Sequence, residues 1–329
     1  MKRHLVWLAV ALAVLVAIPF VCNTLHTNLM VRLAIEALFA VSLNLLLSFT
    51  GLLSFGHALY FGVGAYTAAL LLTHLEGLPL LVAVLLSSLA ATLVALVLSP
   101  LLVRVRATAF TMLTLAFGQL MFVLCSKFRE VTGGEDGIMG WTTPPLGLAG
   151  LFSLELNRPV NMYFFAVGLA CLGILAMWHF TRTPMGSVMI SIRDNQKRVD
   201  YLGYQVVLTK AVIFCLSGFF AGLAGAVYAV FNNLVSVGGV LHIMVSFQPL
   251  MAVLVGGIGT FFGPILGSGL LLLLEEVTQA YPELAMMISG LIFIMVVMFL
   301  PGGAISFGAR LRAWWQKRAY LRKTRESAA

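Results

Sequence analysis

Long apolar runs separated by short polar stretches dominate the chain, and most runs match the length of a membrane-crossing helix. Such a helix needs about 20 largely apolar residues. The apolar pattern predicts ten helices, over residues 5–22, 29–49, 53–73, 80–103, 108–125, 160–180, 210–231, 241–256, 261–277 and 284–301. The eighth is short and precedes a glycine-rich turn, so we expect a re-entrant or broken helix there. Ten crossings would place both termini on one side of the membrane.

In the polar stretch over residues 182–209, apolar and charged residues follow a regular pattern that a solvated loop does not require. Three apolar residues fall on one face of a helix, with charged residues around the rest of its surface. These three are Val188, Ile192 and Val199. Pro184 favours a helix start and Gly203 favours a stop. The pattern predicts one short amphipathic helix; the alternative is a basic loop that only orients its neighbours.

The composition supports a membrane protein of a single domain. Of the 329 residues, 61% are hydrophobic and 10% are charged, and the mean hydropathy is +1.03. A net charge of +8 does not indicate nucleic-acid binding, because the basic residues flank apolar runs and gather near the C-terminus without interleaved stacking aromatics. We expect an all-α polytopic membrane domain over residues 1–309, followed by a basic cytoplasmic tail over residues 310–329.

The distribution of basic residues predicts the orientation. With the N-terminus inside, sixteen Lys and Arg residues are cytoplasmic and four lie outside. This bias predicts cytoplasmic termini, a cytoplasmic 182–209 loop and an external 126–159 loop.

Catalysis finds no support in the sequence. The nearest match to an intramembrane serine protease motif, around Ser217, lacks its first glycine, and the chain has no phosphate-binding Walker motif. The four cysteines form no metal-binding pattern, so no metal site is predicted. Of the ionisable residues within the predicted spans, His57 and Glu36 are the candidates for a transport role.

Two regions contain candidate residues for a translocation pathway or gate. The first is the start of the third predicted helix, and the second is the glycine-rich break. The residues are Ser54, Gly56, His57, Gly62, Gly64, Gly256, Gly257 and Gly259. Close helix packing explains the same residues and stays an open alternative at both places.

The external loop contains a Gly-Gly-x-Asp-Gly turn sequence. Its candidate docking residues are Gly133, Gly134, Asp136 and Gly137. They could form an anion-binding nest or a docking edge. A plain turn is the alternative.

Five blocks together give the chain a family resemblance. They are GLLSFGHALYFGVGAYTAALL at 51–71, TGGEDGI at 132–138, TPMGSVMISIRDNQKRVDYLGY at 183–204, SGFFAGLAGAVYA at 217–229 and GGIGTFFGPILGS at 256–268. In this order they resemble the permease subunits of branched-chain amino-acid ABC transporters, in particular the M-type subunit of the high-affinity leucine/isoleucine/valine import system.

The resemblance implies a multi-pass protein of the bacterial inner membrane, with an ABC-importer permease bundle and a cytoplasmic coupling helix. Its implied partners are a homologous second permease, two cytoplasmic ATPases that use ATP, a periplasmic binding protein and membrane lipids. No cofactor is expected on this chain. The implied ATPase-coupling residues are Gly186, Arg193, Asp194, Asn195, Arg198 and Gly203.

Three positions of the 183–204 block depart from the family pattern: Val188, Gln196 and Asp200. The shared blocks do not separate branched-chain amino-acid import from sister branches that import urea, short amides or aromatic acids. A membrane scaffold that transports nothing is a further alternative.

The predicted topology can be tested at Glu135. A cysteine placed there should react with a membrane-impermeant thiol reagent added from outside, because the 126–159 loop is predicted to be external. The parent chain, labelled in parallel, corrects for its native cysteines. Labelling only after lysis would invert the predicted topology.

Overall fold

The structure of the protein is a computed structural model. It describes residues 23–75, 77–145 and 158–278, together with Pro19, Leu156 and isolated positions between 287 and 303. The predicted helix over 5–22 apart from Pro19, more than half of that over 284–301, the 310–329 tail and part of the external loop lie outside the described residues.

The described residues are almost entirely helical. The long helices are α2 (Thr24–Thr50), α3 (Ala58–His74), α4 (Leu80–Leu102), α5 (Ala107–Lys127), α7 (Pro159–Thr181), α8 (Pro184–Tyr201), α9 (Val206–Asn232), α11 (Ile243–Gly256) and α12 (Gly263–Thr278). The short elements are α6 (Arg129–Thr132), α10 (Val237–Val240), β1 (Ile138–Met139) and β2 (Leu234–Val235). Within this part of the chain, six helices are long and apolar enough to cross a membrane, if Val237–Gly256 is taken as one. The predicted helices over 29–49, 80–103, 108–125, 160–180 and 210–231 are confirmed, with small shifts at their ends.

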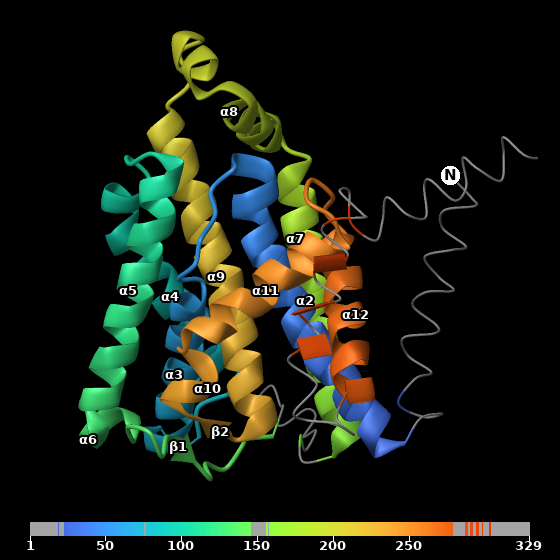
Figure 1. The fold of residues 1–329 in the computed structure, drawn as a ribbon. Helices are drawn as coiled ribbons and strands as arrows, with labels where there is room; N and C mark the ends of the chain where they lie inside the picture. The colour runs from blue at the N-terminus through green and yellow to red at the C-terminus, as the bar shows by residue number, and fades with distance from the viewer. Residues whose placement is uncertain are drawn as a thin grey trace, which may run out of the picture.

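Helix α2 runs obliquely through the bundle between α9 on one side and α7 and α12 on the other (Figure 1). In the most apolar 18-residue window of α2, 67% of the residues are buried, whereas in the corresponding window of α5 only 22% are buried. Helix α5 therefore presents far more of its surface to the surroundings. α2 packs against α7, α9, α11 and α12, while α9 also packs against α3 and α4. The side chains of α2 can therefore reach most of the other helices.

Small residues let α3, α4 and α9 approach closely. A Cβ atom on Gly64 of α3 would collide with the backbone of Gly222 on α9. A Cβ atom on Gly222 would in turn collide with Ala91 of α4.

The predicted helix over 53–73 begins later, at Ala58. Gly51, at φ +71°, ends α2 in a left-handed cap, with Gly51 N–H donating to Leu47 O and Leu52 N–H to Leu46 O. The following residues return into the bundle as a non-helical segment (Figure 1). Sequence periodicity missed this interruption because Leu52, Leu53 and Phe55 extend the apolar run of α3 toward α2.

Side chains from other helices satisfy the backbone of this segment. Thr111 Oγ1 donates to Leu53 O at 2.9 Å, and Phe55 N–H donates to Thr114 Oγ1 at 3.3 Å. Non-helical backbone at membrane depth requires such partners.

The region expected to be re-entrant or broken contains the short helix α11 (Ile243–Gly256), with interruptions before and after it. After α10, His242 caps α11 by accepting a hydrogen bond at Nδ1 from Met244 N–H at 3.3 Å. The chain then turns over residues 257–262, so the helix predicted from 261 begins at Gly263.

Helix α8 and the external-loop elements lie at opposite ends of the bundle (Figure 1). At the lower end, β1 pairs antiparallel with β2, with Ile138 opposite Val235 and Met139 opposite Leu234. The 182–209 loop and the beginning of the 126–159 loop are therefore separated along the bundle axis, as the charge distribution requires.

The single amphipathic helix predicted between Pro184 and Gly203 is interrupted. Asn195 has a non-helical backbone, with φ −158° and ψ 94°, and its Oδ1 accepts a hydrogen bond from Arg198 N–H at 3.1 Å. Asn195 is therefore the N-cap of a second helical piece. α8 is therefore an elbow of two pieces, and the prediction of one short helix was wrong at Asn195.

Two helical glycines should respond differently to substitution by alanine. Gly64→Ala should destabilise the protein by about 1–3 kcal/mol, because the added methyl group collides with α9. Gly168→Ala in α7 is the control, since a Cβ atom there meets nothing within 4 Å. Thermal unfolding in detergent should show a lower midpoint for Gly64→Ala only. An equal midpoint for the two variants would contradict the close α3–α9 contact.

Candidate functional site

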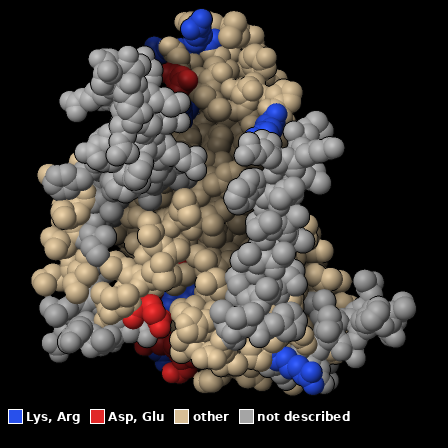
Figure 2. All heavy atoms as spheres, turned by 90° about the vertical axis from the view of Figure 1, so that its right-hand side faces the viewer, with Lys and Arg blue, Asp and Glu red and all other residues tan. Residues whose placement is uncertain are grey.

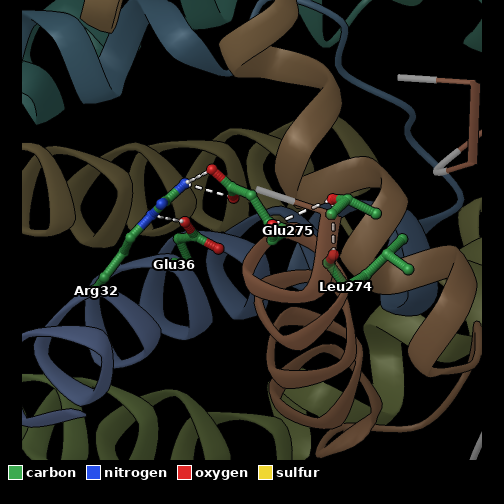
Figure 3. Close-up of polar contacts among 5 residues, drawn as sticks. Arg32, Glu36, Leu274 and Glu275 are labelled. Carbon is green, nitrogen blue, oxygen red and sulfur yellow. Dashed lines mark hydrogen bonds and ion pairs between the residues drawn. The ribbon is translucent and has the colours of Figure 1, made fainter. Parts of the chain in front are cut away.

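Three charged side chains meet beside α2, and we call Arg32, Glu36 and Glu275 the charge cluster (Figure 3). Arg32 Nε donates to Glu36 Oε1 at 2.9 Å, one helical turn away. Its Nη2 donates to Glu275 of α12 at 2.9 Å to Oε1 and 2.7 Å to Oε2. Arg32 lies about 12 Å along the α2 axis from the start of the helix. Charges within a membrane span are costly unless they are paired, and they commonly mark function.

The charge cluster borders a cavity of about 320 Å³ between α2, α3, α9, α10 and α11. Its lining residues are Arg32, Ile35, Glu36, Phe39, Phe61, Tyr228, Phe231, Asn232, Gly239, Val245 and Gln248. A smaller cavity of about 60 Å³ shares Glu36, Phe39 and Gln248 and extends to Glu275. We call the larger space the α2 cavity. Aromatic and aliphatic walls with a few polar groups are typical of small-molecule sites.

The surface fits a position across a bilayer. On the face shown in Figure 2, the coloured Lys, Arg, Asp and Glu side chains lie toward the two ends, and a hollowed, uncharged zone lies between them. This is the arrangement expected when the middle of a protein contacts hydrocarbon.

The predicted pathway residues Ser54 and His57 are fully buried and do not line the α2 cavity. Ser42 Oγ donates to Phe39 O at 2.7 Å, so it accepts from His57 Nε2 at 2.9 Å. The imidazole also stacks on Phe39, with ring centroids 5.3 Å apart. His57 thus has the contacts of a core residue.

The predicted pathway glycines lie at helix contacts. A Cβ atom on Gly56 would collide with Thr114 O, and one on Gly62 with Leu241. Gly64 contacts α9, as described above. These contacts are those of close packing, and a pathway role for these glycines stays a prediction.

The glycine-rich turn is held by α2. A Cβ atom on Gly256 would collide with Gly263 O, and Gly257 and Gly259 have φ values of +123° and +87°. Gly259 N–H donates to Ser48 Oγ at 2.9 Å, and Asn44 Nδ2 donates to Thr260 O at 3.0 Å. Two polar side chains of α2 therefore satisfy backbone groups of the turn.

The same part of α2 holds α8. Arg193 Nη1 donates to Ser48 O at 2.6 Å, while Arg193 Nη2 pairs with the neighbouring Asp194 at 3.2 Å. Ser48 thus links α8 to the 257–262 turn. Sequence reasoning selected Arg193 and Gly259 separately and missed Ser48, because a serine in an apolar helix carries no distinctive pattern.

The other predicted coupling residues divide into two groups. Gly186 and Asn195 have structural roles, since a Cβ atom on Gly186 would collide with Thr181 O and Asn195 caps the second piece of α8. Asp194 and Arg198 are exposed at the end of the bundle, and Gly203 has φ +85° in the turn after α8.

The apolar face of α8 is used within this chain. Ile192 and Val199 are buried and pack with Val206 of α9, and Val188 lies partly buried against them. These residues are therefore not free to form the core of an interface with another subunit. The large side chains exposed next to Gly203 are Tyr201, Leu202 and Tyr204, which are 88%, 70% and 52% exposed.

The predicted docking residues form a structured turn. Gly133, Gly134 and Gly137 have positive φ, and a Cβ atom on Gly137 would collide with Val235 O of β2. Asp136 is exposed at this turn. The pairing of β1 with β2 explains the glycines, and docking of a partner here stays a prediction.

Interrupted helices with satisfied backbones, paired charges within a span and a cavity among the helices define a multi-pass membrane protein of the transport class. A sequence model of the family described as "Branched-chain amino acid transport system / permease component" matches residues 25–297. The chain belongs to this family. It is a transport permease and not an enzyme.

Curated relatives agree with the family. The chain is 26% identical to the high-affinity branched-chain amino acid transport system permease protein LivM of Salmonella typhimurium, and equally to that of Escherichia coli. Each match covers 92% of this chain and 75% of the relative. A probable branched-chain amino acid transport permease protein LivM of Methanocaldococcus jannaschii is 22% identical, over 58% of either chain. No solved structure matches the chain.

Part of the charge cluster is visible in the sequence as a pair of opposite charges. Arg32 and Glu36 form an i, i+4 pair within an apolar run, which is a known helix-stabilising arrangement. The positive-inside count places four basic residues on the external side, namely Arg32, Lys127, Arg129 and Arg158, whereas Glu36 falls within a predicted span. The count therefore does not connect Arg32 with Glu36. Their contact with Glu275, 243 positions after Arg32, requires the folded chain.

A double-mutant cycle should show that Arg32 and Glu275 interact. The two side chains are 36% and 49% exposed, so we expect a coupling of about 1 kcal/mol in the free energy of unfolding. The measurement compares Arg32→Gln, Glu275→Gln and the double variant. Glu130→Gln on α6, combined with Arg32→Gln, is the control and should be additive. Additivity of both pairs would contradict the ion pair.

Proposed function

We propose that this chain forms half of the translocation pathway of an ATP-driven ABC importer for branched-chain amino acids. The observation that carries the proposal is the family match over residues 25–297, with relatives named as high-affinity branched-chain amino acid permeases. The cavity with apolar walls supports a substrate with a hydrophobic side chain. Urea, short amides or aromatic acids are the alternative substrates within transport.

The proposed assembly contains a homologous second permease, two cytoplasmic ATPases and a periplasmic binding protein. In this assembly the chain crosses the bacterial inner membrane ten times, with both termini in the cytoplasm. It binds no cofactor itself, and its partners hydrolyse the ATP. Six membrane-length helices among the described residues and the separation of α8 from β1 and β2 support this arrangement.

Helix α8 is proposed to be the coupling element. It contacts the bundle at Ser48, and Ser48 holds the 257–262 turn, so a displacement of α8 reaches the interrupted helices through α2. Lys210 Nζ donates to Gln196 Oε1 at 2.8 Å and ties the second piece of α8 to α9. Both pieces of the elbow therefore have a fixed contact with the bundle.

The docking surface for the ATPases is proposed to be the exposed tip of α8. Tyr201, Leu202 and Tyr204 provide apolar anchors, and Arg198 and Asp200 provide charge beside them. A cavity of about 590 Å³ lies next to this tip, between the end of α4, α8 and the start of α9. Buried aromatic anchors contribute much of the affinity at protein interfaces.

Uptake by the complete transporter complex in proteoliposomes tests the proposed function. Radiolabelled leucine should accumulate only when ATP and the binding protein are present, and urea should not accumulate. Leucine uptake without the ATPases would contradict the ABC mechanism. Urea uptake would favour the sister branch, and no uptake of any substrate would favour a scaffold.

Loss of the apolar anchors should release the ATPases. The double variant Tyr201→Ser, Leu202→Ser should lower ATPase retention in membranes by more than about tenfold, because each side chain is a candidate hot spot. Ile190→Ser, also exposed but on the first piece of α8, is the control and should retain the ATPases. Normal retention in the double variant would show that docking occurs elsewhere.

A further inference from the structure

The α2 cavity combines two kinds of surface that rarely occur together inside a membrane protein. One side bears the Arg32 guanidinium and the Glu36 carboxylate, with Glu275 on the far side of Arg32. The other sides bear Phe61, Tyr228 and other apolar residues. A ligand that fits must carry both a charged end and an apolar end.

The charges of the cluster specify the charged end. Two carboxylates face one guanidinium, so the cluster has one carboxylate in excess and favours an ammonium group. Arg32 Nη2 donates to both carboxylate oxygens of Glu275 while Nε donates to Glu36, and the same N–H groups can bind a ligand carboxylate. A ligand carboxylate can therefore replace Glu275 on Arg32, and the ligand ammonium can pair with Glu36, which lines the cavity.

The size and position of the cavity restrict the ligand further. A volume of about 320 Å³ is near the lower limit of small-molecule sites, which suits a small metabolite rather than a peptide. Arg32 is near the beginning of α2, at the end of the bundle that also carries β1 and β2 (Figure 1). In the predicted topology this is the external end, where an imported solute enters.

We propose that the α2 cavity is a transient binding site for the zwitterion of an α-amino acid with an apolar side chain. The carboxylate binds Arg32, the ammonium binds Glu36, and the side chain lies against Phe61 and Tyr228. This inference rests on the proposed function and specifies its substrate contact. Occupancy exchanges the Arg32–Glu275 bond for ligand contacts, so the substrate itself loosens α12 from α2.

Photo-crosslinking with a diazirine analogue of leucine tests the proposal. The complete complex is purified without the external binding protein, so that selectivity comes from the membrane part alone. We expect the label in peptides of α9 and α11 that contain Tyr228 and Val245. Excess leucine should abolish this label, whereas 2-hydroxyisocaproate, which lacks the ammonium group, should compete more than about tenfold less well.

Variants separate ligand recognition from folding. Glu36→Gln should reduce leucine uptake more than about tenfold. In the competition for the photo-crosslinking label, the same variant should show no preference for leucine over 2-hydroxyisocaproate. Val245→Trp should block labelling by filling the cavity. Val97→Trp on the exposed face of α4 is its control and should label normally. Co-purification of the partner subunits verifies assembly for every variant.

The outcomes distinguish this inference from the proposed function. If the parent complex imports leucine but the label lies outside the α2 cavity, the site is wrong and the import function stands. An unchanged preference in Glu36→Gln, with leucine still imported, also overturns the site. If the parent complex imports no leucine under any condition, the proposed function fails first.

Discussion

The fold depends on partners for backbone groups that are not in helices at membrane depth. The 52–57 segment interrupts helices in the buried interior, where water is not available to bind its peptide groups, and the 257–262 turn interrupts them at the partly exposed end beside α8. Thr111 and Thr114 provide partners for the first, and Asn44 and Ser48 of α2 provide them for the second. α2 is itself uninterrupted and largely buried, which makes it the frame on which the interrupted helices rest.

Helix α2 carries two different polar contacts, one toward each of its ends. Arg32 bonds α12 near one end, and Ser48 bonds α8 and the turn near the other. Sixteen residues of helix separate them, which is about 24 Å along the axis. A stiff helix of this length transmits a displacement between its ends, so the proposed substrate contact and the proposed ATPase contact are connected by one element.

Sequence patterns predicted the helices where length and apolarity decide the structure, as in α4, α5 and α7. They failed at Ala58, because the apolar residues before it suit a helix and only the Gly51 cap and the threonines of α5 show otherwise. They also failed at Asn195, whose capping role depends on a local backbone break.

The candidate site was predicted only in part for a related reason. Motif glycines such as Gly64 and Gly137 are conspicuous in the sequence, and the structure gives them packing contacts. The charge cluster and Ser48 depend on pairs of residues that are far apart in the chain, and a single sequence does not reveal such pairs. The sequence also does not show which apolar side chains of α8 are exposed. In the structure Ile192 is buried within the chain, whereas Tyr201 is exposed and can bind a partner.

The most direct test of the α2 frame is hydrogen–deuterium exchange of the complete complex, measured on peptides that cover the 257–262 turn. In Ser48→Ala the amide of Gly259 loses its acceptor, so this turn should exchange several-fold faster, while residues 233–240 stay unchanged. ATP binding should alter exchange of the turn in the parent complex and should do so less in Ser48→Ala. Equal exchange of the turn in both complexes, with and without ATP, would contradict the claim that α2 connects α8 to the interrupted helices.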